Sequence, residues 1–397
     1  MRPQLEVAQV IDRFLHQLPD HKLTKYHRRT LKAIQACRTA SLGGHVDACD
    51  SCGHLRISYN SCRNRHCPKC QGLNKEMWTI QQEDQLLPTT YFHVVFTLPH
   101  ELNGLCLHNP RFMYDLLLRS SWYTLNTFAR DPKWLGAKSA ATMVLHTWGQ
   151  TLVLHPHVHC IVPNGGLTSK DEWQLPKRGN AKFLYPVKAL KKVFKVFFLK
   201  QMRLALEQGL LILPPDFPSK PARYHPWKEN LYAKDWVVHT KKPFAGVQHV
   251  VKYLARYSHR VAITNHRIKQ IDQQSVQFDY KDYADRGLKK VMTLSGKDFI
   301  QRFCLHILPP GFRKVRQYGF LANASKTKDI AAARKALGRK HKQLLQRAER
   351  KVLAKLRLFS QKVDRCSCCQ KGKMILVYAF IANKDPPVYH TAITHSK

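Results

Sequence analysis

The sequence predicts a mixed α+β fold from three observations. Near the N-terminus, apolar residues recur at the spacing of a helix, at Val7, Val10, Ile11, Phe14 and Leu15. Further along the chain, short runs rich in β-branched and aromatic residues indicate strands, such as "YFHVVFTLP" at 91–99. Between these two regions, residues 43–72 lose the helical pattern and become rich in Cys, His and Gly. This stretch therefore predicts a small separate module.

The first half of the chain alternates helices and strands. Residues 1–40 are expected to form helices, and a short helix at 73–87 ends before Pro88. The strand at 91–99 closes at Pro99, and a helix follows at 110–130. Residues 139–163 predict two strands that meet near Gly149, and "NGGL" at 164–167 predicts a turn.

The second half of the chain is more basic and more helical. The expected elements are a basic helix at 188–209, a Pro-rich connector at 213–226, a helix at 244–260, strands at 275–280 and 289–296, and a long basic helical stretch at 328–363. A short cysteine cluster, "CSCC", follows at 366–369. No internal repeat is present.

The charge balance points to a polyanionic partner. The 397 residues include 66 Lys and Arg but only 26 Asp and Glu, which gives a formal net charge of +40. With 44% hydrophobic residues the chain is expected to fold, and its length allows two or three domains. No apolar run is long enough to span a membrane, and the N-terminus lacks a secretory pattern, so we expect a cytoplasmic protein. In that compartment, cysteines are metal ligands more often than disulfides.

Two CxxC pairs stand close together in the cysteine-rich stretch. Cys49 and Cys52 form one pair, and Cys67 and Cys70 form the other. Two such pairs present four thiolates in tetrahedral geometry, which is typical of a structural zinc ribbon. Such a closed site supports folding and DNA contact and leaves no position for catalysis.

The same stretch holds further donors and cations. A second zinc is possible on Cys37, His45, Cys62 and His66, although His66 and Cys62 could equally be surface residues. Basic residues of this module are expected to contact DNA phosphates. They are Arg56, Arg63, Arg65 and Lys69.

The strand "LHPHVHCIVP" at 154–163 places histidines at every second position. His155, His157 and His159 therefore point to one face, because a strand alternates its faces with period two. They could be solvated or hydrogen-bonded core histidines, but several in register also suit a metal site. Residues two apart lie about 6.6 Å from each other and can share one ion, whereas residues four apart are separated by about 13 Å.

The segment "KYLARYSHR" places Tyr253 and Tyr257 one helical turn apart and on one face. On their own they could be a packed aromatic pair. Lys252, Arg256 and Arg260 surround them with positive charge. A phenol needs cations or a metal before it can attack a phosphate, so these residues also suit a tyrosine nucleophile.

Several long motifs resemble the rolling-circle transposases of the two-tyrosine HUH class, the insertion sequence 91 family. They are "GGHVDACDSCGHLRISYNSCRNRHCPKCQ", "YFHVVFTLP", "HPHVHCIVPNGGL", "VVKYLARYSHRVAITN" and "FCLHILPPGFRKVRQYGFLAN". The resemblance covers roughly residues 10–323. It implies an HUH-endonuclease antiparallel sheet flanked by helices, with a histidine pair on a central strand and the tyrosine helix beside it. At the C-terminus, "CSCCQKG" keeps the CxxC spacing but has Ser367 and Gln370 where relatives often have Pro and Gly, which makes a third zinc doubtful.

The resemblance also assigns site residues. The family's histidine pair corresponds to His157 and His159, which leaves His155 as a structural residue. By analogy with viral replication proteins, the third metal ligand would be Gln150, seven positions upstream of His157, with His146 as the alternative. Such ligands with open positions favour Mg²⁺ or Mn²⁺.

Three segments follow from this interpretation: N-terminal helices and a zinc-binding transposase domain at 1–88, a catalytic domain at 89–323, and a basic helical region with a Cys knuckle at 324–397. The expected function is a transposase that nicks and joins single-stranded DNA through a 5′-phosphotyrosine intermediate. Its partners would be the ends of an insertion sequence, target DNA and host replication machinery, near the nucleoid. The alternatives are a zinc-ribbon DNA-binding regulator without catalysis and a metal-dependent nuclease that uses activated water. The sequence leaves the oligomeric state open.

Overall fold

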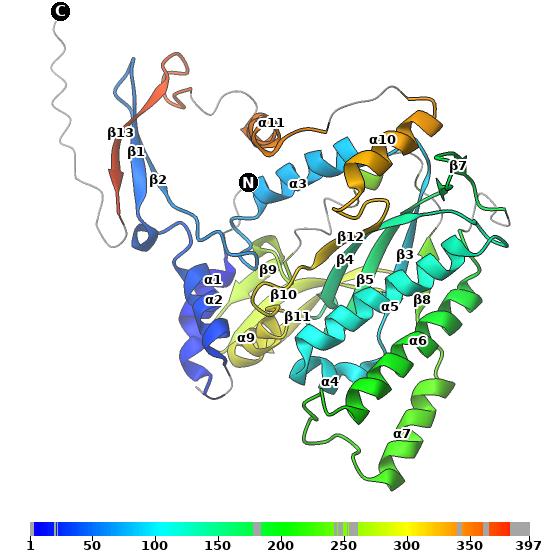
Figure 1. Cartoon of the computed structure of the whole chain (residues 1–397). Coiled ribbons are helices and arrows are strands. Elements are labelled where there is room, and N and C mark those ends of the chain that lie inside the picture. The colour runs from blue at the N-terminus through cyan, green and yellow to red at the C-terminus, as the bar shows by residue number, and fades with distance from the viewer. Residues whose placement is uncertain are drawn as a thin grey trace, which may run out of the picture. The chain divides into compact units, whose positions relative to one another are not determined.

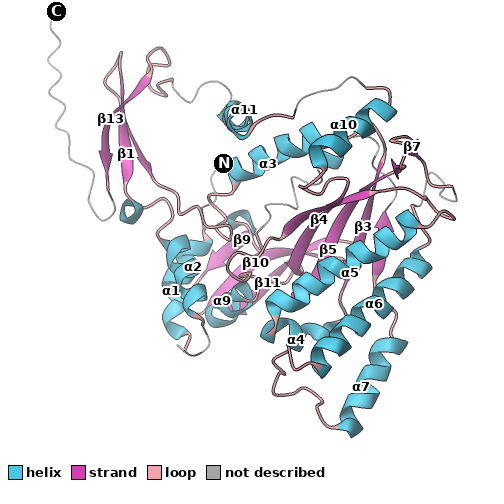
Figure 2. Ribbon diagram, in the orientation of Figure 1, coloured by secondary structure: helices cyan, strands magenta, loops and turns pink. Residues whose placement is uncertain are grey.

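The computed structural model describes residues 4–19, 21, 23–177, 184–241, 244, 249–251, 253, 261–339, 344–359 and 365–381. The chain forms two compact units, each built from separated stretches of sequence. The first unit comprises residues 1–80, 259–307 and 346–397, and the second comprises 81–258 and 308–345. Both contain antiparallel sheets with helices beside them, which confirms the predicted α+β class (Figure 1, Figure 2).

The second unit is organised around a five-stranded antiparallel sheet with the order β12-β4-β5-β3-β8. Its strands are β3 (Tyr91–Thr97), β4 (Ala140–Trp148), β5 (Leu154–Pro163), β8 (Val238–Lys241) and β12 (Val315–Gly319). The histidine-bearing strand β5 is central, with β4 and β3 on either side. A small hairpin, β6 (Gly166–Leu167) with β7 (Trp173–Gln174), follows it.

Helices cover one face of this sheet (Figure 1). Those that contact its strands are α4 (Asn103–His108), α5 (Pro110–Arg130) and α6 (Val187–Glu207). Helix α7 (Pro221–Ala233) follows α6 in the chain. Helix α5 begins at Pro110, whose missing N–H costs nothing in the first turn. Helix α6 presents Phe194 to Phe96 of β3, with the ring centroids 4.9 Å apart, and to the fully buried Trp236.

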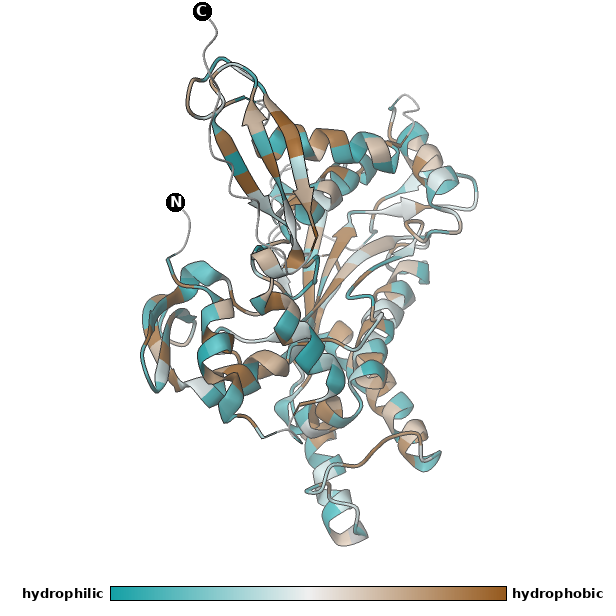
Figure 3. Cartoon of the chain, turned by 90° about the vertical axis from the view of Figure 1, so that its left-hand side faces the viewer, coloured by the Kyte–Doolittle hydropathy of each residue, from teal (hydrophilic) through white to brown (hydrophobic). Residues whose placement is uncertain are grey.

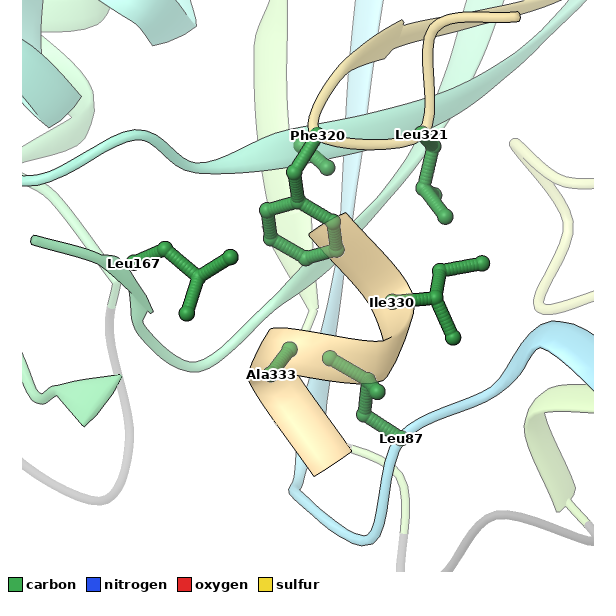
Figure 4. Close-up of a cluster of buried hydrophobic side chains, with 7 residues drawn as sticks. Leu87, Leu167, Phe320, Leu321, Ile330 and Ala333 are labelled. Atoms are coloured by element: carbon green, nitrogen blue, oxygen red, sulfur yellow. The ribbon is translucent and has the colours of Figure 1, made fainter. Parts of the chain in front are cut away.

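Helix α10 (Lys326–Ala336) packs on the start of β4 through a separate apolar cluster (Figure 4). Ile330 and Ala333 of the helix meet Phe320 and Leu167 there. Arg334 on the same helix is buried and donates to the carbonyl oxygen of Asp84. Part of the basic C-terminal stretch is therefore structural.

The first unit places the N-terminal helices against residues from the middle of the chain. It contains α1 (Val7–Phe14), α2 (Lys25–Gln35), α9 (Gly296–Cys304) and the sheet of β9 (Ile268–Ile271), β10 (Ser275–Asp282) and β11 (Leu288–Ser295). Phe14 packs so closely on Gly296 that a Cβ there would lie 2.1 Å from its ring. The side chain of Ser295 caps α9 by accepting from the backbone N–H of Asp298.

A three-stranded sheet in the same unit joins the two ends of the chain. Strands β1 (Gly44–Cys49) and β2 (Leu55–Tyr59) form a hairpin, and β13 (Met374–Phe380) pairs antiparallel with β1. Figure 3 shows the mixture of polar and apolar residues on this sheet. These units cut across the expected boundaries at 88 and 323, so the three-part division stays a prediction.

The remaining described elements are α3 (Gly72–Gln85), α11 (Arg347–Phe359) and the 3₁₀ helices η1 (Leu15–Gln17), η3 (Ala40–Leu42), η4 (His100–Leu102) and η5 (Asn265–Arg267). The structure confirms the helices expected near 73–87, 110–130 and 188–209 and the strands expected within 91–99, 139–163, 275–280 and 289–296. The Pro-rich connector was predicted too long, because α7 begins at Pro221 and contains Pro226. Among the described residues, no helix is long and apolar enough to cross a membrane.

Candidate active site

Three histidines from two adjacent strands meet on one face of the five-stranded sheet. In the β4–β5 register, His146 lies directly opposite His157, and Val144 lies opposite His159. Residues paired in this way point to the same face of an antiparallel sheet. One nitrogen from each of His146, His157 and His159 lies within 4.8 Å of the other two. This is close to the spacing that one ion needs with metal–nitrogen bonds of about 2.1 Å.

Hydrogen bonds fix the orientation of these rings. The Nδ1 atom of His157 donates to the carbonyl oxygen of His155 at 2.7 Å. The Nδ1 atom of His159 lies 2.9 Å from Nε2 of His93, which comes from the neighbouring strand β3. Trp148 stacks on the ring of His146 with the centroids 4.6 Å apart. Such outer contacts set the tautomer and hold the ring of a metal-binding histidine in place.

Burial keeps the histidines neutral. Loss of hydration lowers the pKa of His157 to about 4 and that of His93 to about 3, and it lowers the pKa of His159 further still. Positive charge on neighbouring histidines would add to the effect at His159. A neutral imidazole retains the lone pair that binds a metal, so His157 and His159 suit a divalent ion at neutral pH.

Tyr253 lies beside this cluster. Residues 249–251 and 253 are helical, and the hydroxyl of Tyr253 is 2.9 Å from Nε2 of His93 and 3.4 Å from Nδ1 of His159. The Tyr253 ring also packs on Phe244, with the centroids 5.2 Å apart. Sequence reasoning placed Tyr253 and the histidines in one site, and the structure brings them together.

Several expected site residues fall elsewhere. Tyr257, Lys252, Arg256 and Arg260 lie outside the described residues. Gln150, the expected third ligand, is in the turn between β4 and β5, whereas the alternative, His146, joins the histidine pair. His155 is exposed and is not part of the cluster.

The predicted zinc ribbon is wrong in its grouping. Its two CxxC pairs, Cys49 with Cys52 and Cys67 with Cys70, do not share one site. Cys67 and Cys70 instead cluster with Cys37 and Cys62, and the sulfur atoms of Cys62 and Cys70 are 3.5 Å apart. The reason is local. Cys37 lies in the turn after α2, and the loop at 60–71 brings Cys62, Cys67 and Cys70 to it, whereas Cys49 and Cys52 lie at the turn between β1 and β2.

The second predicted ligand set is also wrong. Its cysteines, Cys37 and Cys62, belong to the cluster just described, and its histidines contact other groups. His45 lies on β1, with Nε2 3.9 Å from a carboxylate oxygen of Asp47. His66 accepts a hydrogen bond from Arg65 Nε at 3.4 Å.

The predicted phosphate-binding arginines differ in exposure. Arg63 is exposed and has a φ of 53°, and Arg65 is half-buried. Two other cations of the module already face carboxylates. Arg56 lies 2.7 Å from Asp47, and Lys69 lies 2.6 Å from Glu6.

Sequence reasoning missed His93 and gave His146 only second place. Both lie in strands that were predicted correctly, but period-two alternation within one strand does not reveal which residues of its neighbours lie opposite. The signal that was available is that "YFHVVFTLP" and "TMVLHTW" each carry one histidine in an otherwise apolar run.

Comparison with known proteins identifies the class. A family described as "Putative transposase" matches residues 140–328, and one described as "Transposase zinc-binding domain" matches residues 6–98. The chain is 40% identical over 396 residues to "Putative transposase y4qJ" of Sinorhizobium fredii. The matched region covers 96% of this chain and 97% of that relative. The chain is 29% identical over 314 residues to "Transposase for insertion sequence element IS801" of Pseudomonas savastanoi pv. phaseolicola, covering 78% and 73% respectively. No solved structure matches the chain.

These matches define a transposase with a zinc-binding domain, whose partner is DNA. The chain belongs to the insertion sequence 91 family of transposases, which confirms the resemblance drawn from its motifs. The matched zinc-binding domain, together with the clustered cysteines, indicates Zn²⁺.

Proposed function

We propose that this transposase nicks and joins single-stranded DNA as an HUH enzyme, with Tyr253 as a nucleophile beside a divalent ion held by His146, His157 and His159. One observation carries the proposal. The Tyr253 hydroxyl is 2.9 Å from His93, and His93 is 2.9 Å from His159, so the phenol lies at the edge of the histidine cluster.

The donor set fits a divalent cation. The pKa values of His157 and His159 are lowered by burial, so both imidazoles are unprotonated at neutral pH and can act as ligands. Of Mg²⁺ and Mn²⁺, three nitrogen ligands favour Mn²⁺, because Mg²⁺ prefers oxygen. When bound, the ion would polarise the scissile phosphate of the DNA.

The protein groups perform the transfer itself. The phenol oxygen of Tyr253 forms a bond to phosphorus, and the bond from phosphorus to the 3′ oxygen breaks. The phenol proton ends on that oxygen, so the products are a 5′-phosphotyrosine and a free 3′ hydroxyl. His93 holds the hydroxyl of Tyr253, and this contact aims the phenol oxygen toward the cluster.

A second tyrosine would allow strand transfer. Tyr257 lies four residues after Tyr253, so a helix through both would place the two phenols one turn apart. One phenol can hold a 5′ end while the other makes a second cut. The phosphotyrosine conserves the energy of the broken bond, and host replication can extend the free 3′ hydroxyl. We therefore propose rolling-circle transposition of an insertion sequence, a role consistent with the relative described as a transposase for insertion sequence element IS801.

Zinc and positive charge would serve DNA binding. We propose that Cys37, Cys62, Cys67 and Cys70 hold a structural zinc ion, because four thiolates make a closed tetrahedral site. The exposed Arg63 beside it, together with a formal charge of +40, suits contact with DNA phosphates. Work on DNA would place the protein in the bacterial cytoplasm, at the nucleoid.

Formation of a covalent adduct tests this function. A single-stranded oligonucleotide from the element's ends is labelled at its 3′ end and incubated with protein and Mn²⁺. We expect the label to migrate with the protein on a denaturing gel, whereas a 5′ label does not. The double variant Tyr253→Phe/Tyr257→Phe should form no adduct. Its control is Tyr283→Phe, which should form the adduct as the wild type does, because that tyrosine is 73% exposed. A DNA-binding regulator or a nuclease that uses activated water would form no adduct, and such a result would contradict the proposal.

A further inference from the structure

A second cysteine cluster in the first unit combines residues from both ends of the chain. Cys49 and Cys52 flank the turn between β1 and β2, and Cys366 and Cys369 precede β13. We propose that these four thiolates bind a second structural zinc ion, which joins the C-terminal knuckle to the N-terminal module. The site is independent of the proposed DNA chemistry, and half of its ligands lie outside the matched zinc-binding domain at residues 6–98.

The sulfur spacing suits one tetrahedral ion. The sulfur of Cys49 is 3.6 Å from that of Cys369, and the sulfur of Cys52 is 3.7 Å from that of Cys366. All four lie within 4.8 Å of one another. Zinc–sulfur bonds of about 2.3 Å in a tetrahedron place the sulfur atoms about 3.8 Å apart, whereas a disulfide needs about 2.05 Å.

The two knuckles have the same local structure, although Ser367 and Gln370 in the C-terminal one made a zinc site there doubtful from the sequence. In each, the residue after the second cysteine adopts a left-handed conformation, with φ of 67° at Gly53 and 57° at Gln370. In each, its N–H donates to the carbonyl of the first cysteine at 3.1 Å, from Gly53 to Cys49 and from Gln370 to Cys366. Gln370 therefore takes the position that glycine would favour, and the missing glycine does not prevent a knuckle from forming.

Backbone N–H groups point at the sulfurs from both knuckles. Ser51 donates to Cys49 at 3.4 Å, and Cys368 donates to Cys366 at 3.3 Å. Gly372 donates to Cys369 at 3.4 Å. Hydrogen bonds to sulfur stabilise the negative charge of a thiolate, which is the form that binds zinc.

Close approach of the knuckles requires a glycine. A Cβ at Gly372 would lie 2.4 Å from the sulfur of Cys49 and 2.6 Å from the Ser51 hydroxyl. The backbone N–H of the adjacent Lys373 donates to a carboxylate oxygen of Asp50 at 2.8 Å, and the backbone N–H of Asp50 donates to the carbonyl oxygen of Lys373 at 3.0 Å. The ladder between β1 and β13 starts from this contact.

The proposal has a consequence for the whole chain. Cys49 and Cys369 are 320 residues apart, so the second site cannot form until the chain has been synthesised through Cys369. A chain truncated before residue 366 would keep the first cysteine cluster but would lose two ligands of the second cluster and strand β13. The N-terminal module is thus complete only in a chain that extends through β13.

Zinc counting on full-length reduced protein tests the site. We expect two zinc ions per chain in the wild type and one in Cys366→Ser and in Cys369→Ser. Cys368→Ser is the matched control and should keep two, because this exposed cysteine lies in the same knuckle but outside the cluster. Two zinc ions retained in Cys369→Ser would overturn the proposal, and so would a single wild-type ion that Cys67→Ser removes.

A glycine variant covers the case in which the serine variants fail to fold. Gly372→Ala keeps every cysteine, but its methyl group would crowd the sulfur of Cys49. We expect a colorimetric chelator to remove one of the two zinc ions at least tenfold faster than from the wild type. Gly72→Ala is the control, since a Cβ there meets nothing within 4 Å. Equal release rates in the two glycine variants would contradict the proposed site.

Discussion

The histidine cluster and the cysteine clusters both gather metal-binding side chains, but they draw them from the chain in different ways. His146, His157 and His159 come from two strands joined by a short turn, and β3 supplies His93 from the adjacent position in the sheet. The second cysteine cluster instead joins residues 320 positions apart. Strand periodicity predicts the shared face of His157 and His159, which lie on one strand, but His146 and His93 join them only through pairing with neighbouring strands. A site closed by distant parts of the chain depends on long-range pairing for all of its contacts.

The two kinds of cluster also differ in chemistry. Three imidazoles would leave coordination positions on a bound ion for a phosphate, which suits catalysis, while four thiolates would close the coordination sphere of zinc. We therefore expect perturbation of the histidine cluster to abolish reaction with little change in folding. Loss of a cysteine should instead unfold part of the first unit.

The largest effect should follow from removal of both tyrosines. The variant Tyr253→Phe/Tyr257→Phe should form no covalent adduct, because neither phenol remains, but should still bind DNA. Each single Phe variant should nick and form an adduct, while complete transposition in cells fails. Denaturing gels and a transposition assay measure the two outcomes. An adduct in the double variant would locate the nucleophile elsewhere.

Loss of one histidine of the proposed metal site should reduce cleavage almost as much. His157→Ala should bring Mn²⁺-dependent cleavage of single-stranded DNA to background. His155→Ala should leave measurable activity, because this exposed neighbour lies outside the cluster. A chelator such as EDTA should stop wild-type cleavage reversibly, and added Mn²⁺ should restore it. Equal inactivity of the two alanine variants would show that the ligand assignment is wrong.

A smaller loss is expected when His93 is replaced. His93→Gln removes the ring that contacts both the Tyr253 hydroxyl and His159, so both lose alignment. Outer contacts of this kind are worth about 10- to 100-fold in activity or metal affinity. His239→Gln is the control, since His239 is exposed on the neighbouring strand β8. The Mn²⁺ concentration for half-maximal cleavage should rise in His93→Gln, and an unchanged value with unchanged adduct yield would exclude a positioning role.

A substitution in the cluster of Cys37, Cys62, Cys67 and Cys70 should change the stability of the first unit and leave the fold of the second unit unchanged. Cys67→Ser should release one zinc ion and raise hydrogen exchange in residues 25–80, because Cys67 is fully buried and lies in one cluster with Cys37, Cys62 and Cys70. Peptides from β3, β4 and β5 in the second unit should keep wild-type protection. Elemental analysis and hydrogen-exchange mass spectrometry make the comparison, and intact zinc content in Cys67→Ser would contradict this assignment.

Acidification should produce the smallest effect and should act on the histidine cluster. The folded-state pKa of His93 is about 3, below the ordinary value of 6.5, because the ring is buried. Between these pKa values the imidazole of His93 binds a proton in the unfolded chain but not in the folded chain. The contribution of His93 to the free energy of unfolding is therefore fully present above pH 6.5 and is lost as the pH decreases toward 3. At pH 5 this single group should cost about 2 kcal/mol in metal-free protein.

Hydrogen exchange of β3–β5 peptides at pH 7 and pH 5, corrected for the intrinsic rate, measures that loss. His93→Gln should show a smaller decrease in protection between the two pH values than the wild type, because it lacks this proton-binding group. An equal decrease in both proteins would mean that burial of His93 does not contribute to acid sensitivity.

Local pattern explains most of the elements that were predicted correctly. Helix α5 was expected at 110–130 and occupies Pro110–Arg130, since Pro110 suits a first turn and an apolar stripe follows it. The elements missed from the sequence are short strands such as β8, β9 and β12, with 4, 4 and 5 residues. Too few residues are present in such strands to show a period, and pairing with a neighbour decides that they form.

The sequence by itself determined the class of fold, the positive charge, the presence of zinc-type cysteine pairs and the shared face of His157 and His159. Each of these depends on composition or on spacing within one element. Only the tertiary structure decided that His146 and His93 complete the histidine site and that Cys67 and Cys49 belong to different clusters. The physical reason is that strand neighbours and knuckle partners are chosen by burial and backbone pairing across long stretches of chain, and the spacing of a motif does not encode those contacts.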